Sequence, residues 1–206
     1  MNKKIYKISI SSFAKGRHYK YGEFTEIIDK HGKVYNSEYG ESNYYNIMHS
    51  ATNEIDSIKM KVTEYHGSKP RLYPNFLQIN LIYVGIDPTA IQFLDTNSIS
   101  YKTYPINILN DSSVNYRLVV FPSLQIQLFD LVASNAVVAD GYIKIKGQSY
   151  PASVADLTLT SKSSEINSIV SMKEYPTALL CDEDTKIKLE KSKLTGFSLR
   201  EMKIAD

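Results

Sequence analysis

The sequence predicts an α+β fold, with a mostly antiparallel sheet, two or three short helices, and a strand, a helix and a strand at the C-terminal end. Two observations lead to this prediction. Apolar residues occur mainly in short stretches, many of which alternate with polar residues as in strands that have one solvated face. Helix signals are fewer and do not alternate regularly with the strands, so a parallel α/β sheet is not expected.

The clearest local signals lie between residues 175 and 204. Residues 177–181 are an apolar run of the length of a buried strand. Acidic residues at 182–184 then fit the start of a helix, where carboxylates meet unpaired N–H groups and the positive end of the helix dipole. Lysines lie toward the other end of this helix, and Gly196 is expected to terminate it because glycine adopts a left-handed conformation without strain. Residues 197–204 resume as a strand.

Two further helices are expected upstream. Apolar residues spaced by three and four predict a helix over about residues 44–53. A second helix is predicted over residues 89–94, because Asp87 and Pro88 form an acidic cap followed by a proline at the first helical position. Residues 164–172 fit either a short helix or a strand.

The other strands are predicted from apolar runs and from alternation. Residues 11–40 are a polar, glycine-containing region that holds only an apolar island at 24–28 and a turn at His31-Gly32. In chain order, strands are expected at residues 6–10, 57–65, 76–84, 99–109, 114–121, 124–128, 141–146 and 154–160.

Length and composition fit one domain. The chain has 206 residues, of which 43% are hydrophobic and 22% charged, the balance of a folded protein with an ordinary core. We expect a single α+β domain over residues 1–206. Residues 66–74 hold two prolines and a glycine, and they are the expected boundary if the domain is divided into two lobes.

The formal net charge of +2 argues against a general nucleic-acid binder, which needs a basic face to release counterions. Charge is nevertheless uneven along the chain. Residues 1–33 hold eight Lys or Arg and three Asp or Glu, a net of +5, whereas residues 72–140 hold two and five, a net of −3. This split either steers a partner of opposite charge or solvates separate surface faces.

The single cysteine, Cys181, rules out an internal disulfide and a cysteine-based zinc site. It lies in an apolar run, so we expect a small buried hydrophobe rather than a nucleophile. The N-terminal residues lack the uninterrupted apolar core of a signal peptide, and no window approaches the roughly 18 apolar residues of a membrane span. We therefore expect a cytoplasmic protein in a reducing compartment that does not bind membranes.

No catalytic, cofactor or metal motif stands out. The four histidines lack a metal-ligand spacing, and the chain has neither a glycine-rich dinucleotide fingerprint nor a phosphate-cradling loop. The carboxylate pairs Asp182/Asp184 and Glu54/Asp56 fit helix capping and solvation better than acid–base catalysis. We expect no enzymatic activity, no cofactor and no metal.

An acidic, tyrosine-rich region between Lys33 and Lys59 is the best candidate for a partner-binding surface. It contains no Lys or Arg, so its carboxylates suit a basic site on a partner, and tyrosine adds rigid contact area. The alternative is that Tyr44 packs inward from the predicted helix and that the carboxylates only solvate the surface. The predicted interface residues are Tyr35, Glu38, Tyr39, Glu41, Tyr45, Glu54 and Asp56.

The C-terminal pattern of apolar strand, acidic cap, lysine-rich helix, Leu194-Thr-Gly-Phe197 and closing strand resembles the end of a family of bacterial immunity proteins from polymorphic-toxin systems. Tyr116 and Phe129-Asp130-Leu-Val-Ala-Ser134 are similar to that family's aromatic-led strand and acid-to-serine step. The resemblance spans roughly residues 114–204. It implies a cytoplasmic, non-enzymatic protein that binds a cognate toxin and blocks it by steric occlusion.

The sequence leaves two other function classes open. One is a small-molecule-binding or enzymatic domain with its site at the 66–74 connector. The other is a structural subunit of a larger assembly, which would associate through a tyrosine-rich face or an unpaired strand edge. Neither the oligomeric state nor the activity of the toxin is specified by the sequence.

Overall fold

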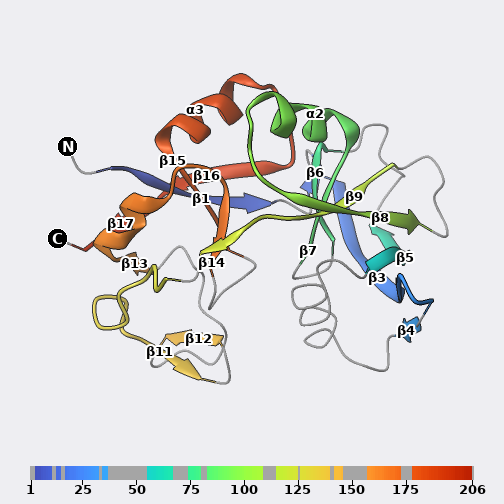
Figure 1. Ribbon diagram of the computed structural model, residues 1–206, viewed down its shortest axis with the longest axis horizontal. Coiled ribbons are helices and arrows are strands. Elements are labelled where there is room, and N and C mark those ends of the chain that lie inside the picture. The colour runs from blue at the N-terminus through green and yellow to red at the C-terminus, as the bar shows by residue number, and fades with distance from the viewer. Residues whose placement is uncertain are drawn as a thin grey trace.

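The computed structural model shows an α+β protein in which sheets dominate (Figure 1). The part of the chain that it describes holds two α-helices and many strands, most of them paired antiparallel, so the predicted fold class is confirmed. Helices α2 (Pro88–Thr96) and α3 (Glu183–Lys191) lie on the same side of the molecule. The described residues are 3–10, 13–14, 17–32, 34–36, 55–66, 74–79, 83–108, 115–124, 126–139, 142–145, 157–172 and 178–205.

Five strands form the first sheet: β1 (Ile5–Ile10), β10 (Ser123–Leu124), β14 (Val170–Met172), β15 (Leu179–Asp182) and β16 (Phe197–Glu201). Their order is β10-β14-β15-β1-β16. Strand β1 pairs antiparallel with β15 on one side and with β16 on the other, so β15 and β16 run parallel to each other. Helix α3 joins these two strands, as the predicted strand, helix and strand require, and the N-terminal strand fills the place between them.

Helix α3 begins where the sequence predicts. The Asp182 carboxylate accepts a hydrogen bond from the Thr185 amide at 3.1 Å, which satisfies one of the unpaired N–H groups of the first turn. Glu183 and Asp184 add negative charge at the positive end of the helix dipole. Leu189 is buried beneath the helix and anchors it on the sheet.

The prediction that Gly196 terminates α3 is wrong. Ser192 caps the helix, because its amide and its hydroxyl both donate to the Leu189 carbonyl, at 3.2 and 2.6 Å. Lys193 then takes the left-handed conformation, with a φ of 60°. Gly196 also has a positive φ, of 95°, and a Cβ at this position would lie 1.9 Å from the Phe76 carbonyl oxygen. Glycine is therefore required here for the close approach of two segments.

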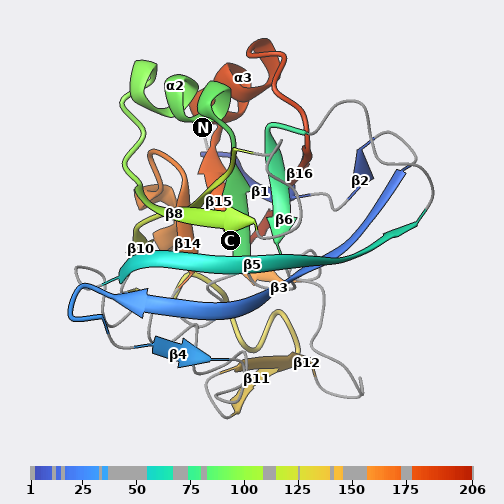
Figure 2. The same ribbon diagram turned by 90° about the vertical axis from the view of Figure 1, so that its right-hand side faces the viewer.

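Eight strands form the second sheet: β2 (Phe13–Ala14), β3 (Arg17–Asp29), β4 (Val34–Asn36), β5 (Ile55–His66), β6 (Phe76–Ile79), β7 (Tyr83–Ile86), β8 (Lys102–Ile108) and β9 (Arg117–Val120). Their order is β2-β3-β5-β8-β9-β7-β6, and β4 pairs with β3. The β5–β8 pair is parallel and the other pairs are antiparallel. Figure 2 shows the two longest strands, β3 and β5, side by side across the molecule.

Strand β3 corrects the prediction of a mainly polar region over residues 11–40. It runs for 13 residues, and its pairing with β5 shifts register next to Phe24 and Ile28. Tyrosine, phenylalanine and isoleucine favour a strand here, but the interspersed lysines and glutamates weaken the apolar pattern. The predicted turn at His31-Gly32 joins β3 to β4, and Gly32 has a φ of 77°.

Three other predictions change in extent. The single strand predicted over residues 76–84 is the hairpin of β6 and β7. The strand predicted over residues 124–128 is reduced to β10, beyond which Phe129 makes an isolated bridge with Leu159. Residues 164–172, which fitted helix or strand, contain both, because the end of a 3-10 helix is followed by β14.

Short elements lie on the side of the first sheet opposite α3 (Figure 1). Strands β11 and β12 form an antiparallel hairpin, of which β11 was not predicted. Strands β13 and β17 pair in parallel. The bounds are β11 (Ala136–Ala139), β12 (Tyr142–Ile145), β13 (Thr158–Leu159), the 3-10 helix η3 (Ser161–Glu165) and β17 (Lys203–Ile204).

Helix α2 confirms its predicted start. The Asp87 carboxylate accepts a hydrogen bond from the Ala90 amide at 2.8 Å, and Pro88 is the first helical residue. The helix continues to Thr96, two residues further than predicted. Ala90 and Leu94 are fully buried and fix the helix on the core.

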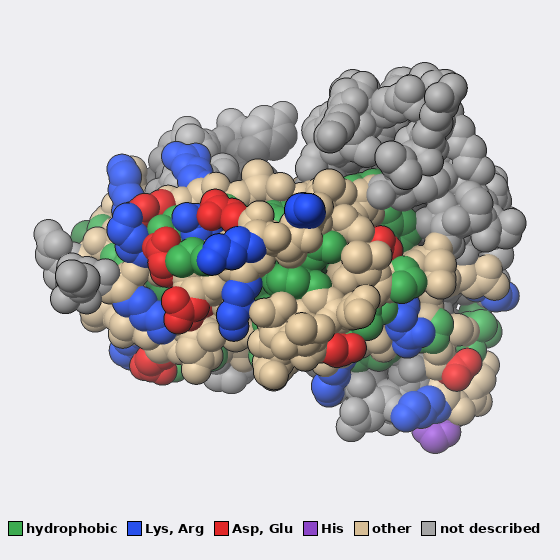
Figure 3. Space-filling view, turned by 90° about the horizontal axis from the view of Figure 1, so that it is seen from above, with side chains coloured by type: hydrophobic (Ala, Val, Ile, Leu, Met, Phe, Trp, Pro, Cys, Tyr) green, Lys and Arg blue, Asp and Glu red, His purple; other side chains and the backbone are tan. Residues whose placement is uncertain are grey.

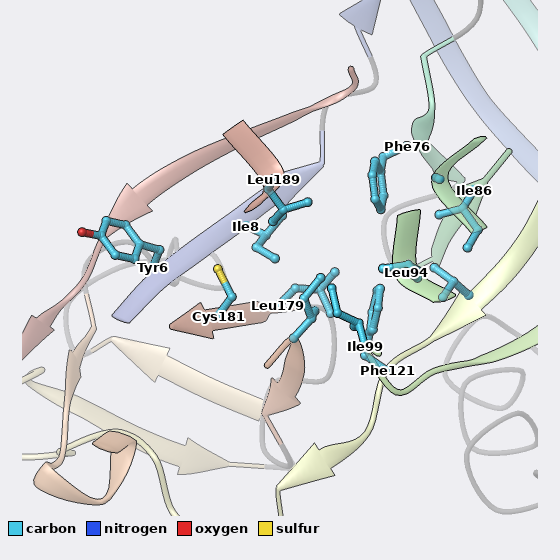
Figure 4. Close-up of a cluster of buried hydrophobic side chains, with 13 residues drawn as sticks. Tyr6, Ile8, Phe76, Ile86, Leu94, Ile99, Phe121, Leu179, Cys181 and Leu189 are labelled. Atoms are coloured by element: carbon cyan, nitrogen blue, oxygen red, sulfur yellow. The ribbon is translucent and has the colours of Figure 1, made fainter. Parts of the chain in front are cut away.

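The middle of the first sheet is buried on both faces. On the α3 side, Tyr6 and Ile8 of β1 join Leu179 and Cys181 of β15, and this cluster continues into α2 and the second sheet (Figure 4). On the opposite face, Leu180 packs with residues of β14 and the short elements. Because β15 is covered on both sides, its sequence is a near-continuous apolar run rather than an alternating one.

The helix predicted over residues 44–53 lies outside the described residues, as does most of the predicted connector over residues 66–74. The single-domain organisation therefore stays a prediction. Neither α-helix of the described ranges is long and apolar enough to cross a membrane.

Candidate functional site

The structure describes two of the seven predicted interface residues. Tyr35 lies in β4 opposite Ile27 of β3, and Asp56 is an exposed residue of β5. Strand β3 pairs with both β4 and β5, so the two residues lie on strands that flank it. The other five, Glu38, Tyr39, Glu41, Tyr45 and Glu54, lie outside the described residues. The acidic, tyrosine-rich surface therefore stays a prediction.

A groove opens at the end of the first sheet, where β1 and the C-terminal strands separate. Strands β1 and β16 are paired up to Tyr6 and Glu201, and the next amide, of Met202, donates to the Ile5 carbonyl at 2.8 Å. The chain then leaves β1, because β17 pairs with β13 instead. The groove has a volume of about 580 Å³ and is lined by Lys3, Lys4, Thr158, Glu201, Met202, Lys203 and Ile204. We call it the lysine groove.

Residues that line the lysine groove make contacts with neighbouring elements. The Lys3 ammonium donates to the Ser164 carbonyl of η3 at 3.0 Å. The Lys4 ammonium lies 3.1 Å from the Glu201 carboxylate. On the far wall the Thr158 amide donates to the Ser134 hydroxyl at 2.9 Å. These contacts connect residues of the lining to η3, to β16 and to the turn at Ser134.

The lysine groove carries an excess of positive charge. Its lining includes three lysines and one carboxylate, a net of +2. Glu201 neutralises Lys4, but a carbonyl oxygen carries no charge to neutralise Lys3, and Lys203 is exposed. This lining can attract and hold an anionic group. Its single carboxylate, Glu201, is paired with Lys4.

A second charged cluster ties α3 to β1 beside Glu201. The Tyr6 hydroxyl donates a hydrogen bond to the Glu183 carboxylate. This bond, reinforced by burial of the ring, raises the pKa of Tyr6, and the same bond lowers the pKa of Glu183. The Lys186 ammonium lies 3.6 Å from Glu183 and 3.2 Å from Glu190. It also lies 5.2 Å from the centre of the Tyr6 ring, a cation–π distance.

Cys181 is a buried residue of the core, as the sequence predicts. Burial is the main cause that raises the pKa of its thiol to about 12, so the nucleophilic thiolate is scarce at neutral pH. In the parts of the chain that the structure describes, no three His, Cys, Asp or Glu side chains are grouped to hold a metal ion.

The acid-to-serine segment of the sequence resemblance has a structural role. The Asp130 carboxylate accepts a hydrogen bond from the Ala133 amide at 2.9 Å and closes the turn that presents Ser134. Ser134 then holds the backbone of Thr158, which lines the lysine groove. The aromatic residue of the resemblance, Tyr116, is buried, and its hydroxyl donates to a backbone carbonyl.

The Leu194-Thr-Gly-Phe197 segment clamps the two sheets together. The Thr195 carbonyl accepts from the Phe76 amide at 3.0 Å, and the Thr195 amide donates to the Asn75 side chain at 2.9 Å. The rings of Phe76 and Phe197 meet edge to face, with their centres 5.5 Å apart. This segment therefore positions β16, which forms one wall of the lysine groove.

No protein-family model and no curated protein matches the chain. Sequence reasoning missed the lysine groove because its lining comes from three separate segments, at residues 3–4, 158 and 201–204. The available signal was the net charge of +5 over residues 1–33, to which Lys3 and Lys4 contribute.

Proposed function

We propose that this chain is a non-catalytic binding protein that neutralises a protein toxin by covering it, the role that the sequence resemblance implies. The observation that supports the proposal most directly is the lysine groove, a preformed and charged recess at the end of the first sheet. Preformed surfaces lose less conformational entropy on association than surfaces that must be ordered.

The surroundings of the groove also suit a protein partner. Figure 3 shows lysine and acidic side chains interspersed over the end of the molecule that carries α3. Exposed residues of that helix, such as Lys188 and Lys191, extend the charged surface beyond the groove. Mixed charges of this kind set the orientation and the rate of association.

The chemistry of the described residues favours binding over catalysis. Glu201 pairs with Lys4, and Glu183 accepts a hydrogen bond from Tyr6, which lowers the pKa of Glu183 and favours its charged form. The one thiol is held protonated in the core. The activity proposed here needs neither group to react.

The test is expression of the open reading frame that lies next to this gene, alone and together with the full chain. We expect the neighbour alone to stop growth, the pair to restore growth, and the two proteins to copurify as a complex. A neighbour that is harmless alone, or toxicity that persists when the chain is present in excess, contradicts the proposal. Turnover that disappears on replacement of one acid or histidine contradicts the non-catalytic assignment.

A further inference from the structure

We propose that the lysine groove receives an acidic peptide segment of the partner, with Asp or Glu side chains lying between Lys3, Lys4 and Lys203. The proposal deepens the proposed function and rests on it only for the statement that the ligand is a protein. It differs from the acidic, tyrosine-rich surface predicted from sequence, which would attract a basic partner.

The first argument is the charge that the groove leaves uncompensated. Three lysines and one glutamate line the groove, and the glutamate, Glu201, is paired with Lys4 at 3.1 Å. Lys3 is positioned by a hydrogen bond to a neutral carbonyl, and Lys203 is exposed. An incoming carboxylate would add charge-assisted hydrogen bonds where the chain supplies no second anion of its own.

The second argument is the rest of the lining. Met202 is buried and Ile204 half-buried, so they give the groove an apolar part, while Thr158 adds a hydroxyl. An Asp or Glu side chain has a carboxylate for the polar part of the groove and methylene groups for its apolar part. Small neighbouring side chains in the peptide would let it enter. A volume of about 580 Å³ lies within the range of ligand-binding sites.

The third argument separates a peptide from a nucleic acid. A nucleic-acid strand needs a basic track along its phosphates, together with stacking surfaces for its bases. The lysine groove offers a net of +2 with no aromatic residue in its lining. Two or three carboxylates of a folded or extended segment fit this short recess better than a chain of phosphates.

The experiment measures fluorescence anisotropy of a labelled octapeptide of alternating Glu and Ala with the full-length protein. Its counterpart with Gln in place of Glu is the uncharged probe, and an oligothymidine of eight nucleotides is the nucleic-acid probe. We expect the Glu peptide to bind at least about ten-fold more tightly than the Gln peptide, because only the former pairs with the ammonium groups. Raising the salt from about 0.01 M to about 1 M should abolish the difference, since the screening length falls from about 30 Å to about 3 Å.

The test variant is Lys203→Glu, which replaces an attraction by a repulsion and should weaken binding of the Glu peptide about five-fold or more. Lys203→Gln removes the positive charge without adding a negative one, so it should weaken binding of the Glu peptide less than Lys203→Glu does. This order is expected from charge and not from a loss of folding. The matched control is Lys102→Glu, an exposed lysine of β8 in the other sheet, which should leave binding unchanged. Circular dichroism checks that each variant is folded.

Equal binding of the Gln peptide, tighter binding of the oligothymidine, or an equal loss in Lys102→Glu would overturn this assignment. The two proposals fail separately. If the Glu peptide does not bind but the toxin is still neutralised, the groove assignment is wrong and the proposed function stands. If the Glu peptide binds as expected but no toxin is neutralised, the groove assignment stands and the proposed function falls.

Discussion

Gly196 shows how one residue joins distant parts of this chain. It lies immediately before β16, directly against the Phe76 backbone, and a Cβ there would also lie 2.8 Å from the Pro74 side chain. Its φ of 95° is outside the range that side-chain-bearing residues usually adopt. Space and conformation thus both require glycine, and the adjacent Phe76–Phe197 contact depends on it.

Replacement Gly196→Ala is predicted to lower the free energy of unfolding by about 2–4 kcal/mol, because backbone strain adds to a collision with a carbonyl group. The measurement is urea denaturation followed by circular dichroism. Gly32→Ala is the matched control, since Gly32 also has a positive φ but no atom within 4 Å of the added Cβ. It should lose only about 1 kcal/mol, from the left-handed conformation alone. Equal losses in the two variants would contradict this account.

The Tyr6–Glu183 hydrogen bond gives the stability a predictable dependence on pH. The pKa of Glu183 is lowered mainly by this bond, so the stabilisation is present above the ordinary pKa of a glutamate and is lost as the pH falls through the lowered value. We expect Tyr6→Phe to be less stable than the native protein at neutral pH, and the difference to shrink toward pH 3. Urea denaturation across this range measures the difference. A constant difference would show that Glu183 is not the partner.

At the scale of the element, the stability of α3 depends on its N-terminal cap and on the contacts of its side chains. An isolated helix of nine residues is only marginally stable in water. In addition, α3 contains no alanine, the residue with the highest helix propensity. Its support comes from the Asp182 cap, the buried Leu189 and the i,i+4 pair of Lys186 with Glu190 at 3.2 Å. The helix in turn covers Tyr6 and the α3 face of β1.

We predict that Asp182→Ala lowers the free energy of unfolding by about 1–2 kcal/mol. The substitution removes a buried helix cap, and the Thr185 amide loses its hydrogen bond to the Asp182 carboxylate. Asp184→Ala is the control, because Asp184 is exposed and contributes through the helix dipole, about 0.3–1 kcal/mol. Chemical denaturation of both variants shows which substitution lowers the free energy of unfolding more. A larger loss in Asp184→Ala would contradict the capping role.

Sequence reasoning succeeded for elements whose signals are local. The starts of α2 and α3 follow from Asp87 and Asp182, and β15 follows from its apolar run. It failed for β3, where charged residues interrupt the pattern and where a partner strand, β5, supplies the pairing from more than twenty residues away. It also joined β6 and β7 into one strand, since both are apolar and Asn80 is the one turn-favouring residue in the sequence between them.

At the scale of the whole molecule, one cluster of apolar side chains joins both sheets and both helices. Phe76 and Ile86 of the second sheet pack in the same cluster as Ile8 and Leu179 of the first (Figure 4). Opening either sheet would expose the other. Cys181 lies inside this cluster and is fully buried, so its thiol reports on the opening of the core.

We predict that Cys181 does not react with an aromatic disulfide reagent at pH 8 until the protein unfolds, because the thiol is inaccessible and its pKa is raised to about 12. The measurement compares the labelling rate along a urea titration with the loss of circular dichroism, and free cysteine in the same buffers calibrates the reagent. Rapid labelling in the absence of denaturant would show that the core opens locally without global unfolding.

The lysine groove could not be predicted from the sequence, because its lining residues come together only in the folded chain. Lys3 and Lys4 gave a signal as part of a basic N-terminal region, but Lys203 and Thr158 come beside them only through the pairing of β17 with β13. Those two strands have two residues each, too short for any periodicity. The recess is created by tertiary pairing alone.

The place of β1 between β15 and β16 has a consequence for how the chain is made. A ribosome releases residues 5–10 at the start of synthesis, but both of their neighbours lie near the other end of the chain, and Tyr6 and Glu183 are 177 residues apart. The first strand therefore lacks both of its partner strands until residues 179–201 have been synthesised. A nascent chain halted before residue 178 cannot complete this sheet.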